Sequence, residues 1–421
     1  MKKNIAIIIL AAGKSTRMKS ELPKAMHPVS CRPMLEYVLD LAKALKVDKT
    51  IAVLGYKHQE VRKLLTPGIK VVLQKKLIGT ADAVKQAGLE LKNFNGTCLI
   101  LYADNPLLKK ETIKKLLKYH VENNLEVTLL TAIVDKPAGY GRILRDEYTS
   151  ISGIIEDKDA NDNQKNIKEI NTGIACFKSS KLFAALKRVR PNNRKREYYL
   201  TDTIGIIYKD GGLVDRVKLD DINEALGINS RVDLANANKI MQARINEDLM
   251  KKGISIVDPG STFIGFGAKI GRDTTIYPFT VIEKHVKIGK RCSVGPYAHL
   301  RDGTVIKDDC LIGNFLEIVR SRFGSKTLIK HFAYIGDSLI GNSVNIGAGT
   351  VTANFDGMNK YTTIIKDNAF IGSDTILVAP LVIGKSSKTG AGAVVVKHSN
   401  IPDNAVVVGV PAKQIKLREG E

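Results

Sequence analysis

Two basic residues, Arg17 and Lys24, lie just after a glycine-containing segment near the start of the chain. Residues 10–18 read LAAGKSTRM, and Pro23 and Lys24 follow shortly afterwards. A strand that runs into such a loop directs backbone N–H groups toward one point, which suits a phosphate. The string Gly-Lys-Ser-Thr matches part of a P-loop, but that motif needs a glycine where Ile8 stands. The segment therefore indicates phosphate chemistry without a P-loop.

A carboxylate, Asp104, follows an apolar run at residues 97–102. Such a run is typical of a buried strand, and open α/β sheets bind their ligands at the carboxyl ends of the strands. Mg²⁺ prefers one or two protein oxygens together with the oxygens of bound phosphates. Asp104 is therefore a candidate Mg²⁺ ligand at the edge of the sheet that also carries the phosphate loop.

His331 stands alone in the segment IKHFAYIGD, residues 329–337. A lone histidine is more often structural than catalytic, although an imidazole, with an ordinary pKa near neutrality, suits a general base. A long polar stretch at residues 352–363 (TANFDGMNKYTT) interrupts the surrounding pattern, and a pure scaffold has little use for such a loop. The stretch favours a functional site nearby.

The elements that carry Arg17, Lys24 and Asp104 read as an α/β domain. Strands are expected at residues 5–10, 50–54, 70–73, 97–102 and 126–134, and helices at 34–45, 81–91 and 110–122. This alternation predicts a Rossmann-like, largely parallel sheet with helices on both faces. Residues 230–252 carry apolar side chains at near-helical spacing and predict a connecting helix. The expected division is a domain at 1–229, the helix at 230–252 and a second domain at 253–421.

The second domain shows an aliphatic residue at every sixth position. The series is Ile264, Ile270, Ile276, Ile282, Ile288, Val294, Leu300, Ile306, Ile312 and Ile318. A period of six fits neither an α-helix nor a flat strand, and it is the pattern of a left-handed parallel β-helix. We expect the array to run to about residue 396, with a charged tail at 397–421.

The composition is that of a globular protein with an excess of positive charge. The 421 residues carry a net charge of +22, no Trp and only 6% aromatic residues. Basic residues are dispersed and do not alternate with aromatics, so specific nucleic-acid binding is disfavoured. Five scattered cysteines favour a reducing compartment. No run approaches a membrane span, and the first twelve residues suit a strand better than a signal peptide. A cytoplasmic location is expected.

The combined motifs resemble one enzyme family over nearly the whole chain. It is the bifunctional N-acetylglucosamine-1-phosphate uridyltransferase/glucosamine-1-phosphate acetyltransferase of bacterial cell-envelope synthesis. The resemblance implies that the first domain transfers UMP from UTP to N-acetylglucosamine 1-phosphate with Mg²⁺. It assigns Arg17 and Lys24 to catalysis, and Asp104 and Asn229 to the metal. It assigns nucleotide binding to Leu10, Ala11, Ala12, Gly13, Lys24, Gln74, Gly79 and Thr80, and the sugar phosphate to Gly141, Glu156, Asn171 and Asn229.

For the second domain, the resemblance implies transfer of an acetyl group from acetyl-CoA to glucosamine 1-phosphate, with His331 as general base. Glu317 is a candidate to orient His331. The implied sugar-phosphate residues are Arg301, Tyr334, Asn345 and Lys360, and the implied acetyl-CoA residues are Ala348, Asn354, Phe355, Ser373 and Ala391. A homotrimer with acetyl sites between neighbouring copies is also implied. Neither membrane insertion nor a specific nucleic-acid partner is expected.

Several residues depart from the family pattern. In the first domain these are Ala103, Asp82 and the pair Lys195-Arg196, which stand for glycine, histidine and Gln-Gly. In the second, Val319 stands for a lysine and Phe355 for a tyrosine. Three interpretations follow: two active enzymes on one chain, a nucleotidyltransferase whose β-helix is only a trimer scaffold or regulatory module, or a non-catalytic assembly subunit. The intact basic and acidic residues of the first domain, with His331, argue against the last.

Overall fold

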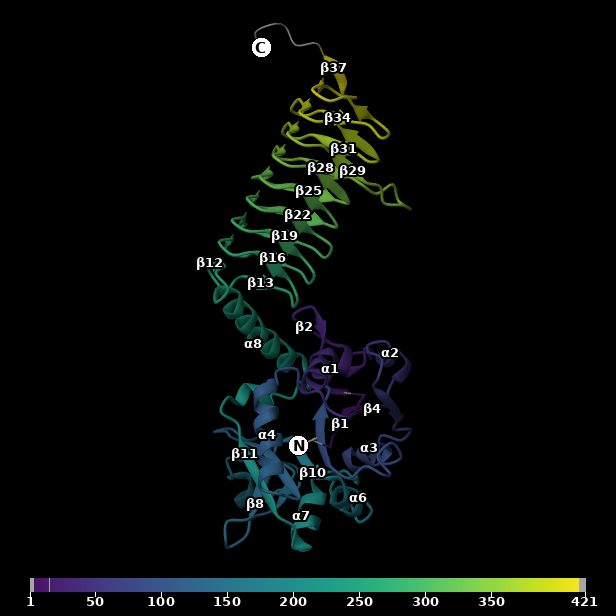
Figure 1. Ribbon diagram of the computed structural model, residues 1–421, viewed down its shortest axis with the longest axis vertical. Helices are drawn as coiled ribbons and strands as arrows, with labels where there is room; N and C mark the ends of the chain where they lie inside the picture. The colour runs from purple at the N-terminus through teal and green to yellow at the C-terminus, as the bar shows by residue number, and fades with distance from the viewer. Residues whose placement is uncertain (1–3, 15, 416–421) are drawn as a thin grey trace. The chain divides into compact units, whose positions relative to one another are not determined.

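The computed structural model describes residues 4–14 and 16–415. The chain divides into two compact units, Met1–Asn238 and Lys239–Glu421. The division falls inside α8 (Arg231–Met250), the longest helix (Figure 1). No helix in the described part of the chain is long and apolar enough to cross a membrane.

A twisted, mostly parallel sheet forms the centre of the first unit. Its main order is β11-β7-β10-β6-β1-β4-β5, and a hairpin of β8 and β9 joins β10. The long strand β10 runs antiparallel to both of its neighbours. The strand bounds are β1 (Ile5–Ala11), β4 (Lys49–Leu54), β5 (Lys70–Leu73), β6 (Thr97–Tyr102), β7 (Val127–Ile133), β8 (Gly141–Arg145), β9 (Ile151–Ile155), β10 (Glu169–Lys178) and β11 (Val214–Lys218), with a small separate pair β2 (Pro28–Val29) and β3 (Arg32–Pro33). The five strands expected from the sequence are all present, shifted by one residue at most.

Helices cover both faces of this sheet. Alternate residues of the fully buried β1 point to opposite faces and pack in two different cores. Ile7 and Ile9 belong to a core with residues of α1 and α4, whereas Ile8 belongs to a second core with α3, α6 and α7. The helix bounds are α1 (Met34–Leu45), α2 (His58–Arg62), α3 (Thr80–Gln86), α4 (Lys110–Glu122), α5 (Asp162–Lys165), α6 (Ser179–Leu186) and α7 (Asp202–Lys209). The helix expected at 81–91 begins one residue earlier, at Thr80, and ends at Gln86. Residues 87–93, which follow it, form turns.

The second unit is a parallel β-helix of the left-handed type, in which each coil gives one short strand to each of three sheets (Figure 1). The first sheet holds β12 (Ser255–Ile256), β15 (Thr275–Ile276), β18 (Ser293–Val294), β21 (Leu311–Ile312), β24 (Leu328–Ile329), β27 (Asn345–Ile346), β30 (Phe370–Ile371), β33 (Lys388–Thr389), β36 (Val406–Val408) and β37 (Lys413–Ile415). The second holds β13 (Phe263–Ile264), β16 (Val281–Ile282), β19 (Ala298–Leu300), β22 (Leu316–Val319), β25 (Ala333–Gly336), β28 (Val351–Ala353), β31 (Ile376–Val378) and β34 (Val394–Val395). The third holds β14 (Lys269–Ile270), β17 (Lys287–Ile288), β20 (Val305–Ile306), β23 (Arg322–Phe323), β26 (Ser338–Ile340), β29 (Thr363–Ile365), β32 (Leu381–Ile383) and β35 (Asn400–Ile401).

The six-residue register explains this architecture. Each aliphatic residue of the series is the inward-facing member of its strand, and nine of the ten are buried, Ile270 being partly exposed. Burying such a column removes about 1.5–3 kcal/mol of unfavourable hydration for each side chain. Phe323 comes five residues after Ile318 yet stacks in register on Ile306, so this coil is one residue shorter.

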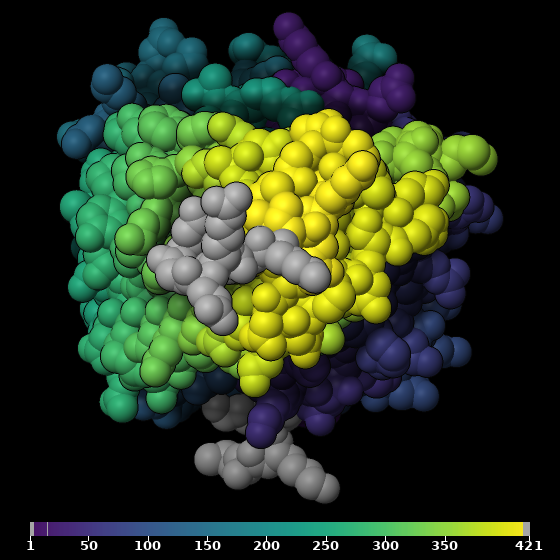
Figure 2. Space-filling model, turned by 90° about the horizontal axis from the view of Figure 1, so that it is seen from above, coloured from purple at the N-terminus to yellow at the C-terminus, as the bar shows by residue number. Residues whose placement is uncertain are grey.

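Two features of the coil differ from expectation. The array does not end near Val396: β35 and β36 form a further coil, and β37 folds back antiparallel on β36. Figure 2 looks onto these last coils, coloured yellow. The expected tail therefore includes a further coil and the end strand β37 as far as Ile415, and residues 416–421 lie outside the described residues. The polar interruption forms a hairpin closed by a bridge between Phe355 and Lys360, which stands away from the coils (Figures 1 and 2).

Candidate active sites

Two cavities meet above the carboxyl ends of β1 and β6. The first, of about 270 Å³, is lined by all eight residues expected to bind the nucleotide, together with Asp104. The second, of about 450 Å³, is lined by Gly141, Glu156, Asn171 and Asn229, the four residues expected to bind the sugar phosphate, and by Arg17. Asp104 belongs to both linings, as do Thr80, Tyr102 and Glu197. Two substrates bound in these cavities would meet at Asp104.

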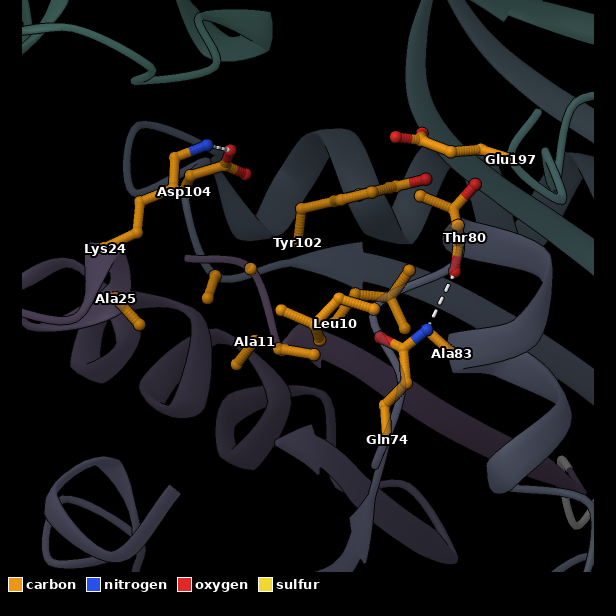
Figure 3. Close-up of a pocket in the computed structure, with 15 residues that line it drawn as sticks. Leu10, Ala11, Lys24, Ala25, Gln74, Thr80, Ala83, Tyr102, Asp104 and Glu197 are labelled. Carbon is orange, nitrogen blue, oxygen red and sulfur yellow. Dashed lines mark hydrogen bonds and ion pairs between the residues drawn. The ribbon is translucent and has the colours of Figure 1, made fainter. Parts of the chain in front are cut away.

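The junction holds a compact set of charged and polar groups. The Lys24 ammonium is ion-paired with Asp104 (Figure 3). It also donates a hydrogen bond of 2.8 Å to Oδ1 of Asn229. Arg17 donates to the same oxygen at 2.6 Å. Lys24 and Asp104 are both mostly buried, so their interaction is less screened than that of a surface pair. The loop after β1, the end of β6 and the start of α8 thus contribute to one site.

The conformation of Gly79 shows why the first cavity needs a glycine at this position. Its φ is +126°, and a Cβ there would lie 2.3 Å from the backbone oxygen of Tyr198. The two segments are in direct contact, because Tyr198 N–H donates to Ile78 and Ala81 N–H donates to Tyr198. Any larger residue would push the segments apart and open the wall of the cavity.

Asn229 is held in place by Asp233, a residue that the sequence motifs did not single out. One Asp233 carboxylate oxygen accepts from the backbone N–H groups of Asn229 at 3.0 Å and Ser230 at 2.8 Å. In return, Ser230 Oγ accepts from Asp233 N–H at 3.2 Å. This is the capping box of α8, and the Ser-x-x-Asp spacing at residues 230–233 is the signal that could have found it.

Burial shifts the titration of two carboxyls beside the second cavity. Desolvation raises the pKa of Glu156, although the Thr201 hydroxyl donates to it at 3.1 Å. Burial, with repulsion from Glu156 and Asp159, raises the pKa of Asp202 to about 6. The surroundings of these two carboxyls are therefore partly desolvated, and hydrogen bonds there are stronger than in water.

His331 begins a column of equivalent positions along one corner of the β-helix. Ile329, Ile346, Ile371 and Thr389 stack in register in four successive coils. The residues two positions later are His331, Ala348, Ser373 and Ala391. Three of them are exposed, and Ala348 is partly exposed. The predicted general base and three predicted acetyl-CoA residues therefore lie in one line, and the small side chains leave room along it.

The predicted sugar-phosphate residues lie mainly at the other edge of the same face. Arg301 is there, and Tyr334 lies on the face between the two edges, as its pairing with Glu317 shows. A Cβ on Gly336 would lie 2.8 Å from both the Tyr334 hydroxyl and the Asn354 amide, so Tyr334 and Asn354 converge at this edge. Asn345 is on the first sheet, before the His331 corner, and Phe355 and Lys360 are in the hairpin. One chain does not bring all of these residues together.

Glu317 and Arg320 each form an ion pair within this half of the chain. Glu317, the candidate to orient His331, accepts a hydrogen bond of 2.7 Å from Arg301 and so positions this arginine. Val319 is buried, with 3% of its surface exposed. The next residue, Arg320, turns outward through a φ of 47° and pairs with both oxygens of Asp337 at 2.6 and 2.7 Å. The Arg320 guanidinium holds the pKa of Asp337 below its ordinary value.

Comparisons with known proteins cover both units. Residues 7–196 match the model of the MobA-like NTP transferase domain, and residues 267–301 and 285–320 match the bacterial transferase hexapeptide (six repeats). A protein of Geobacillus thermodenitrificans (strain NG80-2) named "Bifunctional protein GlmU" is 42% identical over 435 residues, covering 96% of this chain and 94% of its own. The protein of that name from Thermosipho africanus (strain TCF52B) is 42% identical over 445 residues, covering 98% and 96%.

Proposed function

The chain belongs to the family of the bifunctional protein GlmU, and from this premise we propose that it makes UDP-N-acetylglucosamine in two steps. The second unit transfers an acetyl group from acetyl-CoA to glucosamine 1-phosphate. The first unit then transfers UMP from UTP to the resulting N-acetylglucosamine 1-phosphate. The observation that carries the uridyl step is the meeting of the two cavities at Asp104, beside Lys24 and Arg17.

In the uridyl step, an oxygen of the sugar phosphate attacks the α-phosphorus of UTP. The bond from that phosphorus to the bridging oxygen breaks, and pyrophosphate leaves. No protein nucleophile is needed, so the rate comes from positioning and from the stabilisation of negative charge. Lys24 and Arg17 are the cations at the junction, and they would move from Asp104 and Asn229 onto phosphate oxygens when substrates bind.

The donor set at the junction fits Mg²⁺. Asp104 offers a carboxylate and Asn229 an amide oxygen, and both already surround one positive group, the Lys24 ammonium. Among residues 4–14 and 16–415, no group of three or more His, Cys, Asp or Glu is arranged so that it could hold a metal ion. The protein would therefore supply few ligands, and phosphates would supply the others. Bound there, Mg²⁺ would neutralise charge on the phosphates as pyrophosphate departs.

In the acetyl step, the amine of glucosamine 1-phosphate attacks the thioester carbonyl of acetyl-CoA. The carbon–sulfur bond breaks, the CoA thiol leaves, and His331 accepts the proton that the amine loses. Acetyl-CoA would lie along Ala348, Ser373 and Ala391, in line with His331. Arg301 and Lys360 would hold the sugar phosphate, with Tyr334, Asn345 and Asn354 around the sugar and acetyl group.

A homotrimer accounts for the separation of these residues on one chain. The His331 column and the Arg301 corner lie at opposite edges of one face of the β-helix, so corners of two neighbouring copies would complete each acetyl site. Light scattering on the purified protein should give three times the mass of one chain. A monodisperse monomer with acetyltransferase activity would contradict this arrangement. The substrates and the five free cysteines fit a cytoplasmic location.

One experiment separates the candidate functions. The protein is supplied with Mg²⁺, UTP and N-acetylglucosamine 1-phosphate in one assay, and with acetyl-CoA and glucosamine 1-phosphate in the other. We expect pyrophosphate release in the first and free CoA thiol in the second. Silence of the first assay across several sugar 1-phosphates would exclude a nucleotidyltransferase.

A second candidate function is a nucleotidyltransferase whose β-helix is only a scaffold. The burial of Val319 favours it, because a buried valine cannot supply a cation to a sugar phosphate. Pyrophosphate release without any release of CoA would establish this candidate in place of the bifunctional enzyme.

A further inference from the structure

Gln74 presents its side-chain amide to the nucleotide cavity in one orientation. The residue follows β5 and is 5% exposed. Its Nε2 donates one hydrogen bond of 3.0 Å to the backbone oxygen of Gly79 and another of 2.9 Å to Oδ2 of Asp82. An amide NH₂ group has two hydrogens, so both donors are used. In Figure 3 the amide oxygen of Gln74 lies on the side that faces Leu10, and the amide nitrogen lies on the opposite side.

Asp82 is the residue that fixes this orientation. Asp82 lies on α3 and does not line the nucleotide cavity. It therefore binds Gln74 without facing the cavity itself. Its second oxygen, Oδ1, accepts a hydrogen bond of 3.2 Å from Gln86 Nε2. An ionised carboxylate can only accept hydrogen bonds, and so can the Gly79 carbonyl. A flipped Gln74 amide would place its oxygen against two other acceptors, which disfavours the flip.

We propose that Asp82 is a positioning residue for base selection: it locks Gln74 so that only the amide oxygen is offered to the base. This inference rests on the proposed nucleotidyl transfer in the same cavity. A uracil or thymine ring carries a hydrogen on N3 and can donate it to this oxygen. Cytosine has a bare N3, which would bring two acceptors together in a buried site. The lock therefore favours UTP over CTP.

A purely structural role for Asp82 predicts something different. An acidic residue in the first turn of a helix interacts favourably with the helix dipole, and Asp82 is in the first turn of α3. Loss of that interaction alone would lower thermal stability and leave the choice of base unchanged. The ratio of kcat/KM for UTP to that for CTP is therefore the informative measurement.

The test compares the wild type with Asp82→Ala and Asp82→Asn, using UTP or CTP with the same sugar 1-phosphate. In Asp82→Ala the Gln74 amide can turn its NH₂ toward cytosine N3. We expect the UTP:CTP ratio to fall by about tenfold or more, mainly because CTP improves, as expected for a mismatch of buried polar groups. In Asp82→Asn the new amide can still accept from Gln74, so most of the preference should return.

Control variants distinguish a specific effect of Asp82 on base selection from a general loss of stability. Glu111→Ala removes an exposed acidic residue from the first turn of α4 and should leave the ratio unchanged. If Asp82→Ala does not fold, Asp82→Ser replaces it, with competition by UMP and CMP as the measurement. A folded variant that keeps the wild-type ratio would overturn the lock. A wild type that transfers no nucleotide from UTP or CTP would instead contradict the proposed function.

Discussion

The Lys24 ammonium and the Asn229 amide oxygen are 2.8 Å apart, although 205 residues separate them in the chain. Lys24 belongs to the loop after the first strand, and Asn229 immediately precedes the capping box of α8. The contact closes the site by joining the beginning and the end of the first unit.

Replacing Lys24 with Met should disable uridyl transfer selectively. The side chain keeps its length but loses the charge that would stabilise phosphate oxygens in the transition state. We expect kcat for pyrophosphate release to fall by about 10²–10³, the usual loss when one transition-state donor is removed. Lys43→Met, on the exposed side of α1, should retain full activity. A Lys24→Met enzyme with unchanged kcat would show that this cation has no catalytic role.

Asp104→Asn should change the dependence on Mg²⁺. The variant keeps an oxygen ligand but loses the negative charge that Mg²⁺ prefers. Titration of the metal at saturating UTP should show half-maximal activity at an Mg²⁺ concentration about tenfold higher or more. Acetyl transfer by the same sample provides the internal control. An identical titration curve would mean that Asp104 does not contact the metal.

His331→Ala should abolish release of CoA while pyrophosphate release continues. Loss of a general base typically costs about 10²–10⁴ in rate. His398→Ala is the matched control, because His398 is also exposed on a coil of the same β-helix but lies outside the His331 column. Equal acetyl transfer by His331→Ala and the wild type would remove His331 from the mechanism.

A bulky side chain in the His331 column should block the proposed path of acetyl-CoA. Ala391 is exposed and three coils beyond His331, so Ala391→Phe would fill the corner without touching the reacting atoms. We expect KM for acetyl-CoA to rise by about tenfold or more, with a smaller change in KM for glucosamine 1-phosphate. The reverse pattern would place the cofactor elsewhere.

Asp202→Asn should stabilise the first unit at neutral pH. Folding raises the pKa of Asp202 from 3.8 to about 6, chiefly through burial. Its contribution to stability is therefore fully present below about pH 4 and is lost as pH rises through about 6. After allowance for solvent screening, the gain of the variant at pH 7.5 is about 1 kcal/mol, or about 2–4 °C in Tm. At pH 4 the variant and the wild type should have the same Tm. A gain in Tm of equal size at both pH values would exclude the titration of Asp202 as its cause.

Local patterns determined much of the fold. The period of six residues predicted the β-helix because every sixth side chain must enter the same narrow interior, and the buried strands of the first unit were found because they are continuous apolar runs. The extra coil at Asn400–Val408 was missed, although Ile401 and Val407 continue the six-residue spacing from Val395 and so carried the same signal. Arg320 has the positive φ that recurs at the turn positions of the coils, as at Phe315 and Lys326, so the repeat itself places this turn.

The sequence by itself determined the kinds of chemistry: a phosphate loop with two cations, a carboxylate at the end of a strand, and a histidine within a hexapeptide array. Only the tertiary structure decided which of these groups meet. Asp104 joins two cavities, Glu317 binds Arg301, and Asp82 turns the amide of Gln74, because each contact links segments that only the packing of sheet, helices and coils brings together. The residue type determines which hydrogen bonds and charges a side chain can offer, whereas the geometry of the folded chain determines which partner it binds.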